Sequence, residues 1–486
     1  MKRLKFLVYF ILYVSIALPL GASDKRLKAV GDMSLAVPDR DSRINLYQWA
    51  GNVAWLKQND SLNWMRYAAR SDNEWGALHR HWDAKQRSRD DLLFSGQKHL
   101  DGQQTFYGSL MYTADFRLGL NRAIERQPYG LDPFVLADST QGDMTFLGPK
   151  VNVAYNYWLS PKWYLGASLT YAINRGLKQQ FTRPEIINRV VRAGLHAVYR
   201  INGNLSLGLS YGPYHIQDIT KEVKQPDGKS PITYRYRGEY KFRLKVGTYE
   251  RTATYEGFNL RPQIAWTSDR LNGVIMTNYY YQWHELFDGT ITRYYDGYFQ
   301  AEQYAMTTAW RYFAGMRKNT AISFAYHYRF TDGWAREPQA GLLFHRKRIT
   351  RHHITIGASH KLYKPALMLA GEVQYDVRNP DEDDYLAHQY RKGTIANWQA
   401  HAGLEYALTP SWHLRTGLIY QEYDEADVWN YFGDYRGLRG TVGFGYRHVN
   451  WELDGVVQYG RKVNINDAGN DQRGVLNAAL QFRQYF

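Results

Sequence analysis

The clearest pattern in this sequence is Val151-Asn-Val-Ala-Tyr-Asn-Tyr-Trp158, followed after a short turn by Trp163-Tyr-Leu-Gly-Ala-Ser-Leu-Thr-Tyr-Ala172. In both stretches apolar residues alternate with small or polar ones at every second position, which is the period of a β-strand. The turn between them contains Ser160-Pro161-Lys162. The two stretches therefore predict an antiparallel hairpin with one apolar face.

The composition of the other face is unusual for a sheet that meets bulk water. It is rich in Gly, Ser, Asn and Ala, and the apolar face carries an aromatic residue in strand after strand: Trp163, Trp266, Trp398, Trp412, Trp451, Tyr420, Tyr446 and Tyr459. Apolar residues outside, polar residues inside and aromatic girdles at both interfaces are typical of a transmembrane barrel. The barrel has to close, because an open sheet edge in lipid leaves backbone groups unpaired.

The same alternation recurs along most of the chain and predicts an all-β fold, a transmembrane antiparallel up-and-down β-barrel. The expected strands lie at 75–86, 90–100, 104–116, 145–158, 162–175, 188–200, 204–217, 252–266, 272–285, 298–312, 319–331, 348–362, 365–378, 394–408, 412–424, 435–448, 450–462 and 474–486. This pattern indicates about 18 strands, and 16 stays open because the first two are weak. Short and long connections alternate, as periplasmic turns and outer loops do.

The N-terminus has the order of a secretory signal. Residues 1–5 are basic, 6–20 are mostly apolar, and Gly21-Ala22-Ser23 is a small-residue cleavage site. We expect 1–23 to be a signal peptide cleaved after Ser23, with cleavage after Ala22 or an uncleaved anchor as alternatives. Residues 24–74 lack clean alternation and form a periplasmic or lumenal segment or one more hairpin, and 75–486 form the barrel.

The overall composition excludes several other classes of protein. The chain has no Cys, so an exported form does not rely on disulfides. Its net charge of +15 is not concentrated in a run after the signal peptide, and no nucleic-acid motif is present. We therefore expect no nucleic-acid partner, no cofactor, and a location in the cell outer membrane.

Three groups of residues have side chains of the kinds used in catalysis or metal binding. Ser359-His360 resembles a hydrolase pair only in composition, because adjacent strand residues point to opposite faces. The same geometry argues against a metal site at His352-His353. The acidic run Asp381-Glu382-Asp383-Asp384 with His388 is interpreted as a solvated loop. The sequence therefore predicts no enzyme, no catalytic residue and no metal site.

The lumen carries more information about function. Strict alternation assigns ten basic residues inward: Lys150, Arg192, Arg200, Arg261, Arg329, Arg351, Lys361, Arg415, Arg439 and Arg447. Five acidic residues face them: Glu372, Asp376, Glu405, Glu452 and Asp454. The basic excess favours a channel or transporter for small anionic solutes. Bracing of the barrel by Arg–carboxylate pairs, a scaffold that acts through its loops with a partner protein, and a barrel hydrolase are the alternatives, the last being the weakest.

The last residues carry a resemblance to known proteins. Leu476, Ala478, Leu480, Phe482 and Phe486 share one face, and the chain ends in an aromatic residue. This segment resembles the C-terminal targeting signal of bacterial outer-membrane barrels, with Leu480, Phe482 and Phe486 as its anchors, although Gln484 departs from it. The mature chain also resembles the Tyr-rich, uncharacterised barrels of Bacteroidota, through segments such as Phe106-Tyr107-Gly108. The resemblance implies outer-membrane lipid and the barrel-assembly machinery as partners. The oligomeric state stays open.

Overall fold

A computed structural model describes residues 46–56, 62–80, 82–124, 130–180, 182–222, 232–243, 249–289, 292–316, 318–363, 366–425, 434–465 and 471–486. The expected signal peptide, 1–23, lies outside the described residues. Among those described, no helix is long and apolar enough to cross a membrane.

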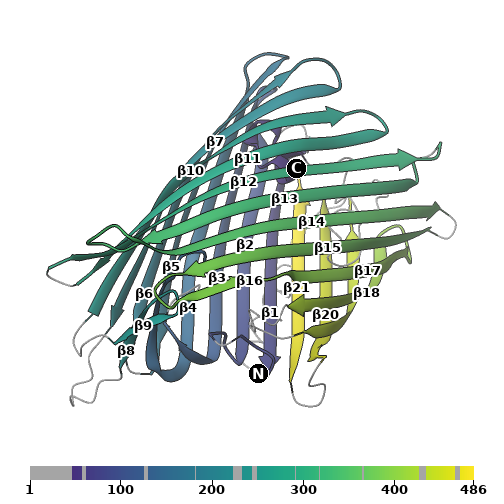
Figure 1. Cartoon of the computed structure of the whole chain (residues 1–486). Coiled ribbons are helices and arrows are strands. Elements are labelled where there is room, and N and C mark those ends of the chain that lie inside the picture. Colours follow the sequence, from purple (N-terminus) through teal and green to yellow (C-terminus); the bar gives the residue numbers. More distant parts are fainter. Residues whose placement is uncertain are drawn as a thin grey trace.

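The strands form one closed ring, and this confirms the barrel (Figure 1). Each strand of the ring pairs antiparallel with the next along the chain, and β1 pairs with β21 over Trp64–Gly76 and Arg473–Tyr485, so the last strand completes the ring. Of the 21 strands in the sheet, β8, β9 and β16 are short additions, and the remaining 18 make the wall. The expectation of 18 strands is confirmed, and the alternative of 16 is wrong.

The bounds of the wall strands are as follows: β1 Trp64–Gly76, β2 Gln86–His99, β3 Gln104–Ala123, β4 Phe134–Trp158, β5 Trp163–Lys178, β6 Glu185–Arg200, β7 Leu205–Glu222, β10 Tyr249–Thr267, β11 Leu271–Asp288, β12 Tyr294–Ala314, β13 Thr320–Arg336, β14 Leu343–Tyr363, β15 Ala366–Asp384, β17 Ile395–Ala407, β18 Trp412–Glu425, β19 Tyr435–Arg447, β20 Trp451–Asn464 and β21 Gln472–Tyr485. The short additions are β8 Thr233–Arg237, β9 Tyr240–Arg243 and β16 Gln389–Lys392. Two short helical segments, α2 Leu46–Ala50 and η1 Val53–Trp55, precede the ring.

The strand alternation follows the sequence pattern. In β5, Trp163, Leu165, Leu169 and Tyr171 are exposed on the outer face, whereas Tyr164 and Ala172 between them are buried. The short turns lie at one end of the barrel and the long connections at the other. Several strands run further toward the long-loop end than expected; β4 has 25 residues, whereas a tilted strand crosses a bilayer in about 9–11. These extensions hold the loops above the membrane.

The first two strands differ from the expectation. The strand expected at 75–86 is wrong: β1 spans Trp64–Gly76, and β2 begins at Gln86 rather than at 90. The barrel therefore begins at Trp64 instead of 75. Alternation in β1 is weak because Tyr67 and Ala69 on one face are followed there by the polar Ser71 and Asn73. The strand is specified by its partners on both sides more than by its own pattern.

Candidate functional site: a basic lumen between an inner plug and a mouth hairpin

Residues 46–56, here called the inner plug, pack inside the barrel. Leu46, Ala50, Ala54 and Trp55 form one cluster with inward side chains of β5, β6 and β10–β13, namely Tyr164, Val198, Ala265, Val274, Ala309 and Ala325. Trp55 is fully buried. Most of these wall residues lie close to the short turns, so the inner plug occupies the short-turn end of the lumen. Within the 24–74 segment, the eleven described residues 46–56 therefore lie in the lumen.

Polar contacts fix the inner plug to the wall. Asn52 is fully buried; its Oδ1 accepts a hydrogen bond from the Ala54 amide at 2.9 Å, and its Nδ2 donates to Gln263 Oε1 at 2.9 Å. Gln263 Nε2 in turn donates to the Ala50 carbonyl at 2.8 Å, and Asn156 Nδ2 donates to the Ala54 carbonyl at 2.9 Å. Buried amides retain their partners because an unpaired one costs about 1–3 kcal/mol.

Glycines in the wall make room for the inner plug. A Cβ atom at Gly166 would lie 2.9 Å from the Ala54 amide nitrogen, and one at Gly208 would lie 2.7 Å from the ring of Trp55. Both contacts are so short that a larger residue at either position would require the inner plug to shift, which is a recognised use of glycine at a close backbone approach. The wall is therefore shaped to receive this segment.

A second obstruction lies at the long-loop end. The mouth hairpin, β8 and β9, pairs with the start of β4, where Phe134 is opposite Arg237 and Asp138 is opposite Thr233. Phe134 packs against Leu286, Phe299 and Phe344 of β11, β12 and β14. These strands are not neighbours of β4 in the ring, so the start of β4 and the mouth hairpin reach across the opening.

Charged groups hold the mouth hairpin in place. Arg237 NH2 lies 2.9 Å from Asp296 Oδ1, and Arg235 pairs with both Asp288 and Asp296. Arg251 of β10 binds the same two carboxylates at 2.9 Å each. Side chains of this cluster are largely buried, where an ion pair depends on good geometry and complete hydrogen bonding.

The loop before β4 adds a largely buried acid to the mouth. Asp132 Oδ2 accepts a hydrogen bond from Tyr255 Oη at 3.4 Å, and Tyr255 stacks on His284 with ring centroids 3.8 Å apart. Burial raises the pKa of the Asp132 carboxyl to about 6. The docked loop therefore favours the protonated acid.

Three of the expected lumen residues form a basic cluster on β4–β10. Arg192 is the cross-strand partner of Thr170, which shares the face of Gly166, and Arg261 shares the face of Gln263. Gly166 and Gln263 both contact the inner plug, so the face that they share with Arg192 and Arg261 is the lumenal one. The charged neighbours of Lys150 are Arg192 and Arg89, and that of Arg261 is Arg192. Within the described residues, none of Lys150, Arg192 and Arg261 forms an ion pair.

The opposite wall is different, because several of its basic residues have acidic partners. Arg415 Nε and NH1 lie 2.8 Å from Glu405 and Asp454, Arg447 NH2 lies 3.6 Å from Glu405, and Glu452 lies 3.6 Å from Arg483. These contacts lie near the short turns of β17–β21. They brace the wall, as the alternative interpretation of the lumen supposes.

The remaining expected lumen residues are spread along the barrel. Arg200 is exposed at a short turn and donates to the Asn202 and Gly203 carbonyls at 3.1 Å each. Arg439 is opposite Gly460, and Lys361 is opposite Met368. Arg329 and Arg351 face each other across β13 and β14 at mid-strand.

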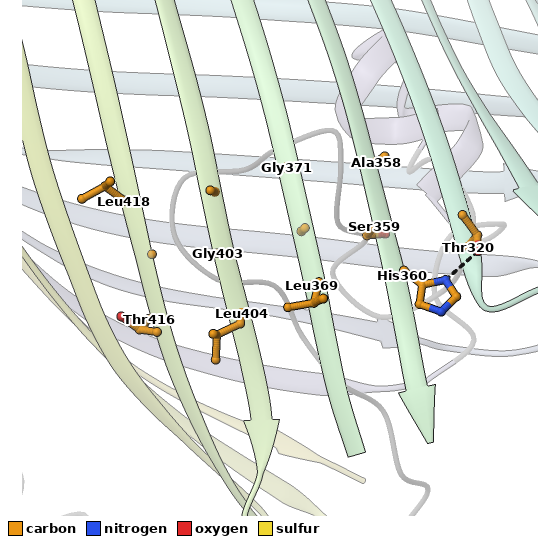
Figure 2. Close-up of a pocket in the computed structure, with 13 residues that line it drawn as sticks. Thr320, Ala358, Ser359, His360, Leu369, Gly371, Gly403, Leu404, Thr416 and Leu418 are labelled. Carbon is orange, nitrogen blue, oxygen red and sulfur yellow. Dashed lines mark hydrogen bonds between the residues drawn. The ribbon is translucent and has the colours of Figure 1, made fainter. Parts of the chain in front are cut away.

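The candidate catalytic and metal-binding residues are not assembled into sites. Figure 2 shows His360 on the outer face of β14, bonded to Thr320 Oγ1 at 2.8 Å, whereas Ser359 of the same strand is buried. His352 bonds Tyr326 and His353 bonds Thr355. No group of three or more His, Asp or Glu side chains that could hold a metal ion occurs among the residues the structure describes.

The acidic run at the end of β15 is built into the wall rather than free in solvent. Asp381 and Asp383 pair with Arg348 at 3.1 and 3.2 Å. Asp384 accepts a hydrogen bond from the Glu239 amide at 2.7 Å, so it holds the mouth hairpin. The interpretation as a solvated loop is therefore wrong, because β15 extends through Asp384 and pairs with β14.

A depression with a volume of about 690 Å³ lies in the outer wall of β13–β18. Figure 2 shows the residues that line it. Small residues such as Ala358, Gly371 and Ala402 form its floor, and Leu369, Leu404 and Leu418 surround it. The depression faces outward, so it is not part of the lumenal route.

The C-terminal residues close the ring. Phe482 stacks near Tyr67 and Trp451, with ring centroids 6.3 and 5.8 Å away, and Leu480 is opposite Ala69 of β1. The Phe486 amide donates to the Asn63 carbonyl at 3.2 Å, and its ring is exposed. Its role as a targeting signal stays a prediction.

Sequence reasoning left a lumenal place open for residues 24–74 without saying which of them enter the barrel, and it missed the mouth hairpin and the basic residue Arg378. A small signal for the inner plug existed: Leu46, Trp49 and Trp55 are apolar in a segment without strand alternation. Nothing in the sequence indicated which wall would receive it.

Solved structures that this chain is similar to include a copper transporter, OprC, with a TM-score of 0.46 and 9% identity over 87% of this chain and 80% of that one. The monoaromatic hydrocarbon channel CymD has a TM-score of 0.35 and 11% identity over 92% and 95%. The ferric yersiniabactin uptake receptor FyuA from Yersinia pestis has a TM-score of 0.40 and 9% identity over 87% and 80%. These are outer-membrane transporters and channels, and the likeness concerns the fold alone.

No curated protein sequence matches the chain. Residues 53–426 match the model of a family described as a family of unknown function, DUF6850. The match begins inside the inner plug and extends to the end of β18. The chain therefore belongs to the family of unknown function DUF6850.

Proposed function

We propose that this protein is an outer-membrane channel or transporter for small anionic solutes, and that the inner plug moves to let them pass. One observation carries the proposal: Lys150, Arg192 and Arg261 face the lumen without forming ion pairs within the described residues. Arg192 is exposed although it points inward, which indicates that water reaches it inside the barrel.

A surplus of positive charge in such a lumen enriches anions. Low-dielectric walls focus the field of the three side chains, and rings of Arg or Lys favour anions in pores. The ion pairs of β17–β21 neutralise much of the opposite wall. Solutes would therefore follow the β4–β10 side of the lumen.

Reversal potentials in a planar bilayer with a salt gradient test this proposal. We expect anion selectivity that increases at low salt, since the Debye length grows toward ~30 Å at about 0.01 M. The triple variant Lys150→Gln, Arg192→Gln, Arg261→Gln should lose it. Arg200→Gln is the matched control, because Arg200 binds turn carbonyls at the short-turn end. Reversal potentials near zero in the native protein would refute anion selection.

The inner plug has to be considered in the same experiment. If the native protein shows no conductance, it can be compared with the variant Gly208→Val, in which the valine side chain would displace the ring of Trp55. Conductance in this variant and not in the native protein would support a movable plug. Closure of both forms would favour the alternative below.

We also propose a location in the outer membrane, with the signal peptide removed after Ser23 and insertion by the barrel-assembly machinery through Leu480, Phe482 and Phe486. A relation to Bacteroidota barrels is part of this proposal. Membrane fractionation and N-terminal sequencing of the mature chain would test it, and retention of Met1 would contradict it.

A scaffold that acts through its loops is the second candidate. The mouth hairpin favours it, because five charged side chains fasten this element across the opening. A fixed outer surface suits a partner protein better than a solute. Absence of conductance even in Gly208→Val would make this the better interpretation.

A further inference from the structure

Three arginines lie side by side at the middle of the barrel. Arg351 of β14 is the cross-strand partner of both Arg329 of β13 and Arg378 of β15. Neighbouring strands are only about 4.8 Å apart, and like charges directly opposite each other are destabilising. The arrangement therefore needs compensating negative charge.

One carboxylate lies among the three arginines. Asp376 Oδ1 accepts from Arg351 Nε at 2.5 Å, and its Oδ2 accepts from Arg378 NH2 at 2.9 Å. Among the residues that the structure describes, Arg329 NH2 contacts His327 Nε2 at 3.4 Å, and the buried Arg329 Nε has no hydrogen-bond partner there. Three positive charges thus meet one negative charge, which leaves a surplus of about two.

The surplus charge is open to the lumen. The side chain of Arg378 is 47% exposed and that of Arg351 is 27% exposed, although both bind the inward-facing Asp376. Next to them, His327 and His353 are directly opposite each other, held by Thr307 and Thr355 at 2.7 and 3.1 Å. Each imidazole uses one ring nitrogen for its threonine contact, so its second ring nitrogen can contact another group.

We propose that Arg329, Arg351 and Arg378 form a binding site for a phosphate-type dianion inside the lumen. A phosphate group carries about −1.5 to −2 charge at pH 7, which matches the surplus. Planar guanidinium groups bind its oxygens in pairs, as they do in other phosphate sites. This inference rests on the proposed function in one respect, which is that solutes pass through the lumen. It adds that the solutes carry a phosphate group.

Asp376 gives the test its direction, because it competes with the ligand for Arg351 and Arg378. In a binding site, Asp376→Asn should tighten phosphate binding, and Arg378→Gln should weaken it. In a purely structural brace, both changes would only destabilise the wall. Each variant is first checked for the native heat-modifiable mobility of a folded barrel.

Calorimetric titration of the folded, full-length protein in detergent measures the binding. Inorganic phosphate should bind more tightly than chloride, and Arg378→Gln should reduce its affinity on the order of tenfold. Arg200→Gln, at an exposed short turn, should leave it unchanged. Titrations repeated in Gly208→Val exclude a blocked entry. Phosphate affinity equal to that of chloride, or unaffected by Arg378→Gln, would overturn the proposal.

One further ligand distinguishes the source of the dianion. Glycerol phosphate that binds as well as inorganic phosphate would identify a site for phosphate esters, and binding of inorganic phosphate alone would identify a site for the ion itself. Either result supports the proposal. Anion selectivity in bilayers without phosphate binding would refute this inference alone. Phosphate binding without conductance in either the native protein or Gly208→Val would refute the proposed function alone.

Discussion

Lys178 shows how strongly single residues at the long-loop end are committed to the fold. Its side chain and that of Asp138 are fully buried, and its Nζ donates to both Asp138 oxygens at 2.7 and 2.8 Å and to the Thr140 carbonyl at 2.8 Å. The pair joins β5 to the start of β4, which carries the mouth hairpin. A buried ion of this kind is tolerated only with its partner present.

We therefore expect Lys178→Ala to lower the free energy of unfolding by about 3–5 kcal/mol, because it leaves the Asp138 carboxylate buried and unpaired. Urea unfolding in lipid vesicles measures the change. Arg175→Ala is the matched control on the same strand, since the Arg175 side chain is 71% exposed in its pair with Glu185 and should contribute less than about 1 kcal/mol. Equal costs for the two variants would contradict this interpretation.

Asp132 predicts a pH dependence at the mouth. Its pKa is about 6 in the docked loop and about 3.9 in an unfolded chain. The docked state thus binds the proton more tightly. Its extra stability is fully present below about pH 4 and is lost as the pH rises through about 6.

Hydrogen exchange in residues 130–134, corrected for intrinsic rates, should accordingly be faster at pH 7 than at pH 5. Asp132→Asn cannot ionise and should show the same corrected exchange at both values. A variant with the native pH dependence would assign the effect to another group.

At the scale of elements, the mouth hairpin is the least conventional part of the fold. It comes from the β7–β10 connection, yet it contacts β4, β11, β12 and the end of β15. Tyr236 also packs edge-on against Trp82 of the β1–β2 connection, with ring centroids 5.5 Å apart. Its position depends on contacts with five separate parts of the ring.

Asp296→Asn should release the mouth hairpin, because Asp296 accepts from Arg235, Arg237 and Arg251. Limited proteolysis should then cut within 233–243 while the transmembrane strands stay protected. Asp332→Asn is the control, since Asp332 binds Arg346 at 2.6 Å within the wall. Equal protection of the hairpin in all three proteins would show that its pairing with β4 and its other contacts hold it without the Asp296 ion pairs.

At the scale of the whole molecule, the inner plug determines whether the lumen is continuous. The chain has no Cys, so a double variant Val53→Cys, Gly166→Cys would contain the only possible disulfide. A Cβ at Gly166 would lie 3.1 Å from Val53 Cβ, which is slightly shorter than the usual Cβ–Cβ distance of about 3.5–4.5 Å across a disulfide. A small shift of the plug would allow the bond.

We expect solute flux into proteoliposomes to stop in the oxidised double variant and to return on reduction. Val53→Cys alone should respond to neither treatment. Flux that persists with the disulfide intact would place the route away from the inner plug.

The sequence by itself determined the barrel and the direction of most side chains. A strand has a side-chain period of two, and the bilayer requires one face of every strand to be apolar. The local sequence therefore determines both where a strand lies and which way its side chains point. Eighteen strands and the mid-strand position of Arg329 and Arg351 follow from that rule. It failed at β1, where Ser71 and Asn73 interrupt the apolar face above the membrane.

Only the tertiary structure decided what lies inside the ring. Asn52 meets Gln263 across 211 positions, and Phe134 meets Phe344 across the mouth. Whether a lumenal arginine is paired also depends on distant strands: Arg415 finds Glu405 and Asp454, while Arg192 finds no carboxylate among the described residues. Alternation gives the direction in which a side chain points, whereas its partner depends on the closed ring, which places remote segments a few ångströms apart.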